Sequence, residues 1–199
     1  MRRVLRMIPG LLLPRISLYD LRAVLAAAVL GAIVAGVYGA LHDQLTYSLS
    51  REYFTKLKFH QFDYADPGLG ERAFAAVVGL LATWWVGFVA AWFLGRRLFP
   101  GQPRATAWRR IALGFAVVLA GGLLGGLAGY AYGVWRGPEA DLAGWQWAIE
   151  RFGVTDARSF VRVAYIHNGG YVGGALGLLA ALLTIHPNRR PLQDMPPVE

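Results

Sequence analysis

The chain has 199 residues, of which 56% are hydrophobic and only 16% are charged, whereas about a quarter of the residues of an ordinary soluble domain are charged. This composition excludes a soluble globular domain and favours a membrane protein. Cysteine is absent, which excludes disulfides, thiolate metal sites and thiol nucleophiles. The formal net charge is +8, but the basic residues flank apolar segments, so we expect membrane lipid and not nucleic acid as the partner.

The chain is interpreted as a single membrane domain, residues 1–199, with four apolar segments that each provide the roughly 20 residues needed to cross a bilayer. A basic leader comes first, and it suits either a segment on the membrane surface or a loose tail. The first span is too long for the apolar core of a signal peptide, so we expect it to remain uncleaved as part of the mature protein. The expected elements are the leader 1–20, spans at about residues 21–42, 73–95, 110–135 and 161–185, and a tail 186–199.

The two connections on the far side of the membrane are each expected to hold a short amphipathic helix. In the first, Ser50 is a candidate cap for a helix with Tyr53 and Phe54 on one side. The second is rich in tryptophan, which favours the membrane interface. Gly153 is expected to end its helix, and Thr155 or Asp156 is expected to cap the next. We therefore predict an all-α four-helix membrane bundle made of two similar hairpins.

The basic residues are distributed unequally between the two sides of the expected membrane. The leader, the middle connection and the tail carry twelve Lys and Arg residues against three acidic ones, whereas the other side carries eight against nine. Lys and Arg in short loops are retained in the cytoplasm, so both termini are expected there. Arginine outnumbers lysine eighteen to two, which indicates a GC-rich bacterium and hence an inner-membrane location.

Small residues recur at every fourth position of each span. Such stripes let helix backbones approach closely, and we interpret them as packing surfaces within the chain, with an oligomer interface or a pore lining as alternatives. The stripes are Ala27, Gly31, Ala35 and Gly39; Ala75, Gly79, Thr83, Gly87, Ala91 and Gly95; Gly121, Gly125, Gly129 and Gly133; and Gly169, Gly173, Gly177 and Ala181.

Two polar groups lie within or beside the spans, where desolvation is costly unless the side chains find partners. Both belong to the same side of the membrane, and Tyr171 shares a helix face with His167 four residues earlier. We therefore expect them to form a ligand pocket in the outer leaflet, or alternatively to register the first helix against the fourth. The candidate residues are His42, Asp43, Gln44 and Tyr47 in the first group and Arg162, His167, Asn168 and Tyr171 in the second.

The function that this pocket favours is binding or passage of a small ion or polar solute. A metal version uses His42, Asp43 and His167, with His60 or Glu52 as further ligands, and the ion is left open. A haem held between the two span histidines is an alternative without an attachment motif. A further alternative is an accessory or scaffold subunit, or a homo-oligomer, that packs through the glycine stripes. Because no nucleophile elbow, phosphate loop or zinc-protease motif occurs, an enzyme is not expected.

Two segments carry a resemblance to a known family. The stretch HDQLTYSLSREYFTKLKFHQF, residues 42–62, and the stretch HNGGYVGG, residues 167–174, resemble paired signatures of a family of bacterial four-helix membrane proteins to which no activity is assigned. The resemblance implies a four-helix membrane fold and no particular chemistry. Because it covers the residues of the two polar groups, it favours a ligand site over simple registration of helices.

Overall fold

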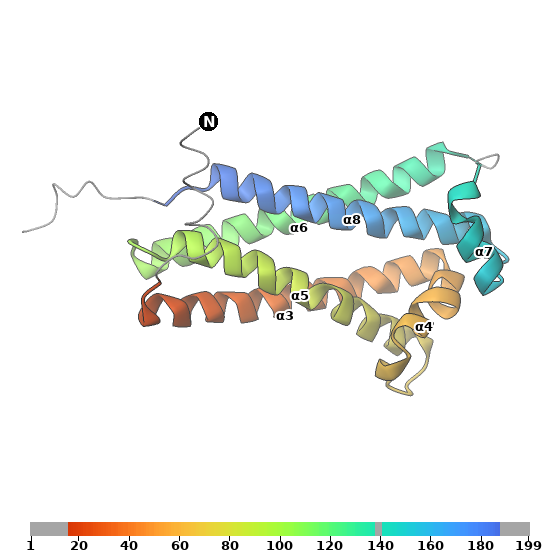
Figure 1. The fold of residues 1–199 in the computed structure, drawn as a ribbon, viewed down its shortest axis with the longest axis horizontal. Coiled ribbons are helices and arrows are strands. Elements are labelled where there is room, and N and C mark those ends of the chain that lie inside the picture. The colour runs from red at the N-terminus through yellow and green to blue at the C-terminus, as the bar shows by residue number, and fades with distance from the viewer. Residues whose placement is uncertain (1–15, 138–140, 188–199) are drawn as a thin grey trace, which may run out of the picture.

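The computed structural model describes residues 16–137 and 141–187, which contain helices and no strand. Four of these helices are long enough and apolar enough to cross a membrane, and together they form a bundle (Figure 1). The predicted all-α four-helix membrane fold is thereby confirmed. The four helices are α3 (Leu18–Leu49), α5 (Glu71–Leu98), α6 (Arg104–Trp135) and α8 (Ala157–Thr184).

Each long helix begins before the apolar span that predicted it, because the backbone hydrogen bonds of a helix continue where its side chains become polar. At the start of α3, Ser17 acts as the N-cap, and its hydroxyl accepts a hydrogen bond of 3.0 Å from the backbone N–H of Asp20. Residues 1–15 of the predicted leader and the tail from residue 188 lie outside the described residues.

The first connection between spans is helical, as predicted, although its hydrogen bonding is partly of the π type. It contains η1 (Tyr53–Lys58), α4 (Phe59–Gln61) and η2 (Asp63–Ala65). The predicted cap is confirmed, since the hydroxyl of Ser50 accepts a hydrogen bond of 3.3 Å from the N–H of Tyr53. Tyr53 and Phe54 are buried, so this segment packs its aromatic side onto the bundle.

The second connection contains η3 (Ala143–Trp145) and α7 (Gln146–Phe152). Gly153 ends α7 in the left-handed conformation, with φ of 60°, which is the geometry that glycine adopts most readily. Of the two predicted caps for the next helix, Asp156 is the one used, because its carboxylate accepts a hydrogen bond of 3.1 Å from the N–H of Ser159.

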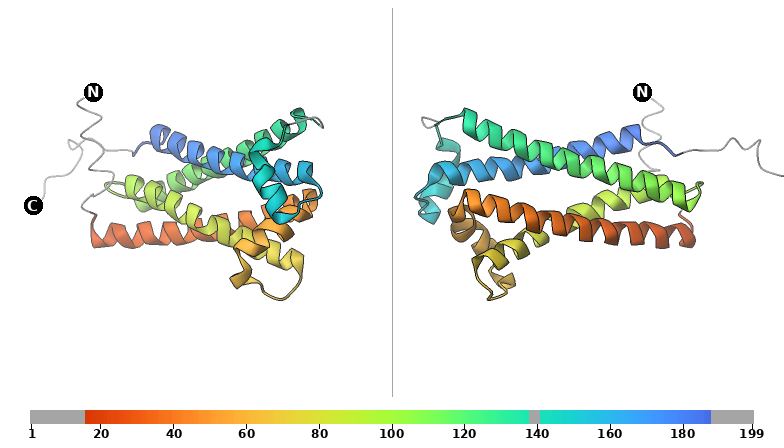
Figure 2. Two further views of the ribbon diagram at one scale, coloured as in Figure 1. Left: turned by 45° about the vertical axis from the view of Figure 1, so that its right-hand side comes forward. Right: turned by 180° about the vertical axis from the view of Figure 1, so that it is seen from behind.

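The long helices pair as two hairpins, α3 with α5 and α6 with α8, and contacts between the hairpins are much sparser. Figures 1 and 2 show the pairs as two layers that run in the same direction. Both short connecting segments lie at one end, called here the capped end, and the α5–α6 connection lies at the other, the open end. The predicted arrangement of two similar hairpins is therefore observed.

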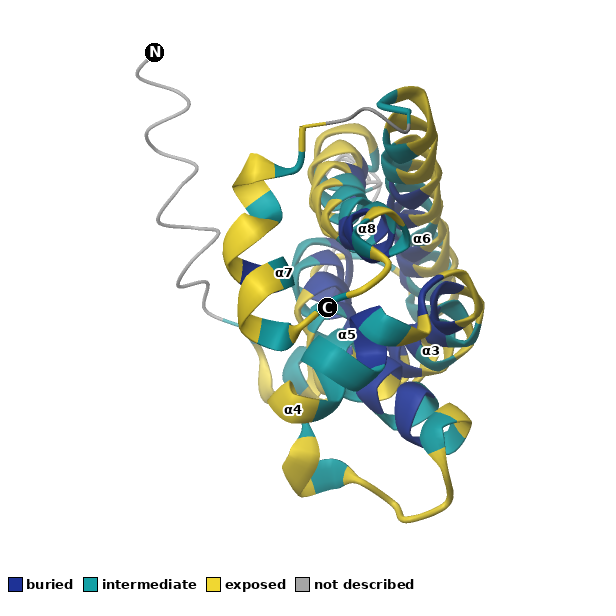
Figure 3. Ribbon diagram, turned by 90° about the vertical axis from the view of Figure 1, so that its right-hand side faces the viewer, coloured by how far each residue is buried: buried dark blue, intermediate teal, exposed yellow. Residues whose placement is uncertain are grey.

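The glycine stripes lie inside these hairpins, as predicted. A Cβ atom added at Gly79 would collide with the backbone of Gly39, and one added at Gly125 would collide with the backbone of Gly169. Such backbone contact between helices requires residues without side chains. The outward faces are exposed and apolar, with residues such as Leu176 at 60% exposure (Figure 3), as expected for a surface that meets lipid.

Candidate functional site

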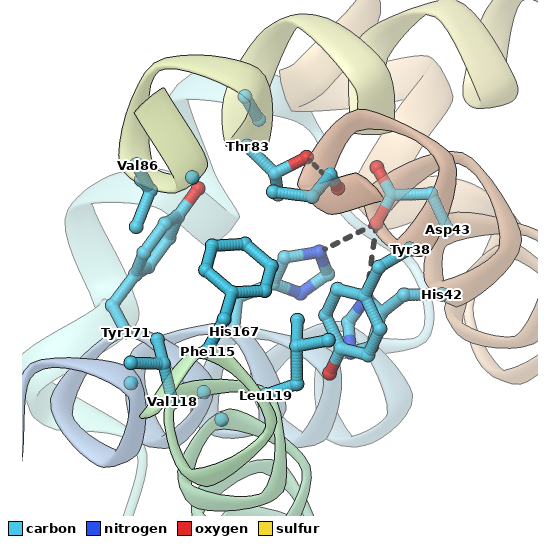
Figure 4. Close-up of a pocket in the computed structure, with 16 residues that line it drawn as sticks. Tyr38, His42, Asp43, Thr83, Val86, Phe115, Val118, Leu119, His167 and Tyr171 are labelled. Atoms are coloured by element: carbon cyan, nitrogen blue, oxygen red, sulfur yellow. Dashed lines mark hydrogen bonds and ion pairs between the residues drawn. The ribbon is translucent and has the colours of Figure 1, made fainter. Parts of the chain in front are cut away.

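The site is centred on Asp43 of α3, a carboxylate that is only 4% exposed. One of its oxygens, Oδ1, lies 3.2 Å from Nδ1 of His42 and 3.1 Å from Nε2 of His167 on α8. Figure 4 shows both imidazoles directed at this carboxylate. Three of the predicted site residues, from two different hairpins, are thus brought together around a single oxygen atom.

The hydrogen bond at Nδ1 of His167 indicates which ring nitrogen carries the hydrogen, and hence what the ring presents to Asp43. Nδ1 of His167 lies 2.9 Å from the backbone carbonyl of Val163. A carbonyl only accepts hydrogen bonds, so Nδ1 carries the hydrogen, and in the neutral ring the lone pair is on Nε2. This lone pair faces a carboxylate oxygen that is also an acceptor. A proton or a cation must therefore lie between the two atoms.

At the capped end, aromatic side chains of η1 cover the cluster. The ring of Tyr53 stacks on His167 with a centroid distance of 4.9 Å, and Phe54 contacts the same imidazole edge-on at 6.3 Å. Burial raises the pKa of the Tyr53 hydroxyl, which therefore stays protonated. Lys58 lies above the Tyr53 ring, and burial lowers the pKa of its ammonium group. The cluster is therefore closed toward the capped end.

Toward the middle of the bundle the cluster opens into a cavity of about 100 Å³ between the two hairpins. Its cluster end is polar and the remainder is lined mostly by apolar side chains, as seen in Figure 4. Each long helix contributes four residues: Ala35, Tyr38, His42 and Asp43; Ala82, Thr83, Val86 and Gly87; Phe115, Val118, Leu119 and Gly122; and His167, Gly170, Tyr171 and Gly174.

Three of the lining glycines have more room around them than the glycines of the packing stripes. No described atom lies within 4 Å of a Cβ built on Gly174, and for Gly170 and Gly122 the nearest atom is each other's carbonyl oxygen, at 3.7 and 3.6 Å. These distances are ordinary or looser contacts. A single methyl group at these positions would therefore fit without forcing the helix backbones apart.

Two predicted residues of the first polar group serve a different purpose. Gln44 donates a hydrogen bond of 3.0 Å to the carbonyl of Arg72, and the hydroxyl of Tyr47 donates to Glu71. Arg51 also binds Glu71, with a distance of 2.6 Å from Nε to Oε2. These contacts tie α3 to the start of α5, and none of the five residues lines the cavity.

The second polar group is also divided by the structure. Tyr171 lines the cavity, but Asn168 is exposed and does not line it, because each residue of a helix is rotated by about 100° from the one before. Arg162 lies in a separate hollow with Gly133 and Tyr165. Among the described residues it forms no ion pair with Asp43, whose partners are the two histidines.

The two further metal ligands considered from the sequence lie outside the cluster. His60 is exposed. Glu52 accepts hydrogen bonds from the backbone N–H groups of Thr155 and Asp156, at 3.0 and 2.7 Å, and from the Thr155 hydroxyl. It thus joins the two short connections at the capped end. The side chains that contact the cluster instead include Tyr53, which the sequence assigned only to the apolar side of a short helix.

No family model, curated protein or solved structure matches this chain.

Proposed function

We propose that this protein binds a divalent transition-metal cation of the zinc class at His42, Asp43 and His167. The observation that carries the proposal is the approach of two imidazole nitrogens, His42 Nδ1 and His167 Nε2, to one buried carboxylate oxygen of Asp43, at 3.2 and 3.1 Å. A metal ion can bind all three side chains, because neutral imidazole nitrogen and carboxylate oxygen are ordinary zinc ligands.

The distances among the three side chains suit such an ion. One ligand atom from each residue can be chosen so that all lie within 4.8 Å of one another. In a tetrahedral zinc site with bonds of about 2.0–2.2 Å, ligand atoms lie roughly 3.3–3.6 Å apart. Small side-chain movements therefore suffice. The hydrogen bond from His167 Nδ1 to Val163 is the kind of second contact that usually orients a metal-binding histidine.

Three protein ligands leave a fourth coordination position, which in zinc proteins is taken by water or another small ligand. Here that position faces the cavity, since Tyr53 and Phe54 cover the opposite side. A haem receives less support, because Asp43 Oδ1 lies within 3.2 Å of both imidazoles, in the space that the plane of the macrocycle would need. An accessory subunit also receives less support, because the glycine stripes pack against each other within the chain.

The proposed setting is a bacterial inner membrane with both termini in the cytoplasm. Five arginines in the helix ends that flank the α5–α6 connection support this orientation: Arg96, Arg97, Arg104, Arg109 and Arg110. The capped end then faces outward. His167 lies ten residues after the start of α8, which is about 15 Å along the helix, so the metal would lie within the outer half of the bundle. A reporter fused to the C-terminus and active only in the cytoplasm tests this orientation.

The metal proposal is tested on the purified full-length protein by competition with a chromophoric zinc chelator and by elemental analysis. One Zn²⁺ per chain is expected, with affinity falling at least about 100-fold in Asp43→Asn and His167→Gln, since loss of an orienting partner alone costs 10–100-fold. Asn168→Ala and His60→Gln are matched controls that keep the affinity. Circular dichroism checks that each variant is folded. Absence of bound zinc in the wild type, or equal affinity in all variants, would overturn the proposal.

A further inference from the structure

A second hollow lies next to the cavity, on the side where α3 and α6 meet. It measures about 310 Å³ and shares two lining residues, Phe115 and Leu119, with the cavity. The two hollows therefore adjoin at these two side chains of α6. The remaining residues of this α3–α6 groove are apolar: Ala27, Leu30, Gly31, Val34, Ala91, Trp108, Ile111, Ala112 and Ala116.

The groove opens on the outward face of the bundle. Leu30 and Val34 are 52% and 45% exposed, and Ala112 and Ala116 are exposed as well. Along α3, the distance from Asp43 to the far end of the groove at Ala27 is sixteen residues, or about 24 Å. One leaflet of the hydrocarbon core is about 15 Å thick. The cavity and groove together are therefore long enough to hold a complete acyl chain.

The charge of the proposed metal site indicates what the polar end of such a ligand must be. A divalent ion bound by Asp43 and two neutral imidazoles has a net charge of +1. A net charge within the membrane is costly, and an anionic fourth ligand removes it. The cavity of about 100 Å³ holds only a few groups of the size of water. A carboxylate, with three heavy atoms, is small enough for this space.

We propose that the protein binds a long-chain fatty acid. Its carboxylate completes the coordination of the metal, and its alkyl chain passes Phe115 and Leu119 into the α3–α6 groove. This inference rests on the proposed metal site. The apolar lining then binds the alkyl chain of a ligand that enters laterally from the membrane. A ligand with a polar head and an apolar chain accounts for a polar cluster at one end of an otherwise apolar cavity.

The test uses the full-length protein in nanodiscs of zwitterionic phospholipid, with Co²⁺ as a coloured substitute for Zn²⁺. Palmitate is expected to change the visible spectrum of the bound Co²⁺, because it replaces the fourth ligand, and acetate at the same concentration is expected to leave it unchanged. In Ala116→Trp, which fills the groove, the half-saturating palmitate concentration should rise at least tenfold while Co²⁺ binding is retained. Ala128→Trp is the matched control, since Ala128 is also exposed on α6 but lines neither hollow.

The outcomes separate the two proposals. Absence of Co²⁺ binding would overturn the metal site and the fatty-acid inference together. Bound Co²⁺ whose spectrum responds equally to palmitate and acetate, or palmitate binding that is the same in Ala116→Trp and Ala128→Trp, would overturn the fatty-acid inference alone and leave the metal site standing.

Discussion

Two adjacent glycines of α8 allow the role of the stripes to be tested by the same change, glycine to alanine, made separately at each position. Gly173 belongs to the stripe that packs on α6, whereas Gly174 faces the cavity. Replacing each by alanine adds the same single methyl group in the same helix, one residue apart. We expect Gly173→Ala to destabilise the protein and Gly174→Ala to be neutral or slightly stabilising.

The magnitude follows from the surroundings of the added Cβ atom. At Gly173 it would lie 3.0 Å from the Cα of Gly125 and 3.0 Å from the carbonyl carbon of Gly121, whereas ordinary contacts are 3.4–4 Å. These are backbone atoms, so α6 and α8 must separate, and overpacking of this kind costs about 1–3 kcal/mol. Around Gly174 no described atom lies within 4 Å. Because alanine favours the helix by about 1 kcal/mol at either position, the difference between the variants isolates the steric cost.

The assay is equilibrium unfolding in mixed detergent micelles with increasing dodecyl sulfate, followed by circular dichroism. Gly173→Ala should have a free energy of unfolding about 1–3 kcal/mol below that of Gly174→Ala. Equal stability of the two variants, or a lower stability for Gly174→Ala, would refute the assignment of Gly173 to the packing stripe and of Gly174 to the cavity wall.

Two further predictions concern hydrogen bonds between elements. The single hydroxyl hydrogen of Thr83 is shared between the carbonyl of Ala35 across the first hairpin, at 2.7 Å, and the carbonyl of Gly79 in its own helix, at 2.8 Å. Thr83→Val should therefore lower the free energy of unfolding by about 0.6–1.7 kcal/mol, and no loss would contradict the structure. At the capped end, burial by itself would raise the pKa of the Glu52 carboxyl, but hydrogen bonds from the backbone N–H groups of Asp156 and Thr155 outweigh it and lower the pKa below 4.5. The unfolded state therefore binds the proton more readily than the folded state. The stability that the ionised Glu52 contributes is present above pH 4.5 and is lost as the pH falls through the pKa of the folded state. Glu52→Gln should be less stable than the wild type by about 1 kcal/mol at pH 7, a small value because the side chain is partly exposed. The difference should shrink on acidification, and a difference independent of pH would refute the assigned contacts.

Much of the architecture could be predicted from patterns of neighbouring residues in the sequence. Runs of apolar residues long enough for a bilayer predicted the four helices. Short signals predicted the start of the first connecting helix at Ser50, the end of the second at Gly153, and the cap of α8 at Thr155 or Asp156. The rotation of each helix about its own axis depends on how the helices pack together, and this rotation determines which side chains face the site. His167 faces Asp43 whereas Asn168, one residue later, is exposed, and the sequence alone did not separate the two.

The sequence by itself determined that the protein is a bundle of four membrane helices, that small residues line their contact faces, and that histidine and carboxylate side chains are present within the spans. These are properties of composition and spacing along single helices. Only the tertiary structure decided that both histidines meet one oxygen of Asp43, that Tyr53 covers them, and that Gly174 faces a cavity instead of a helix. The physical reason is that such contacts join residues more than a hundred positions apart, as with Asp43 and His167, and depend on how the two hairpins pack face to face.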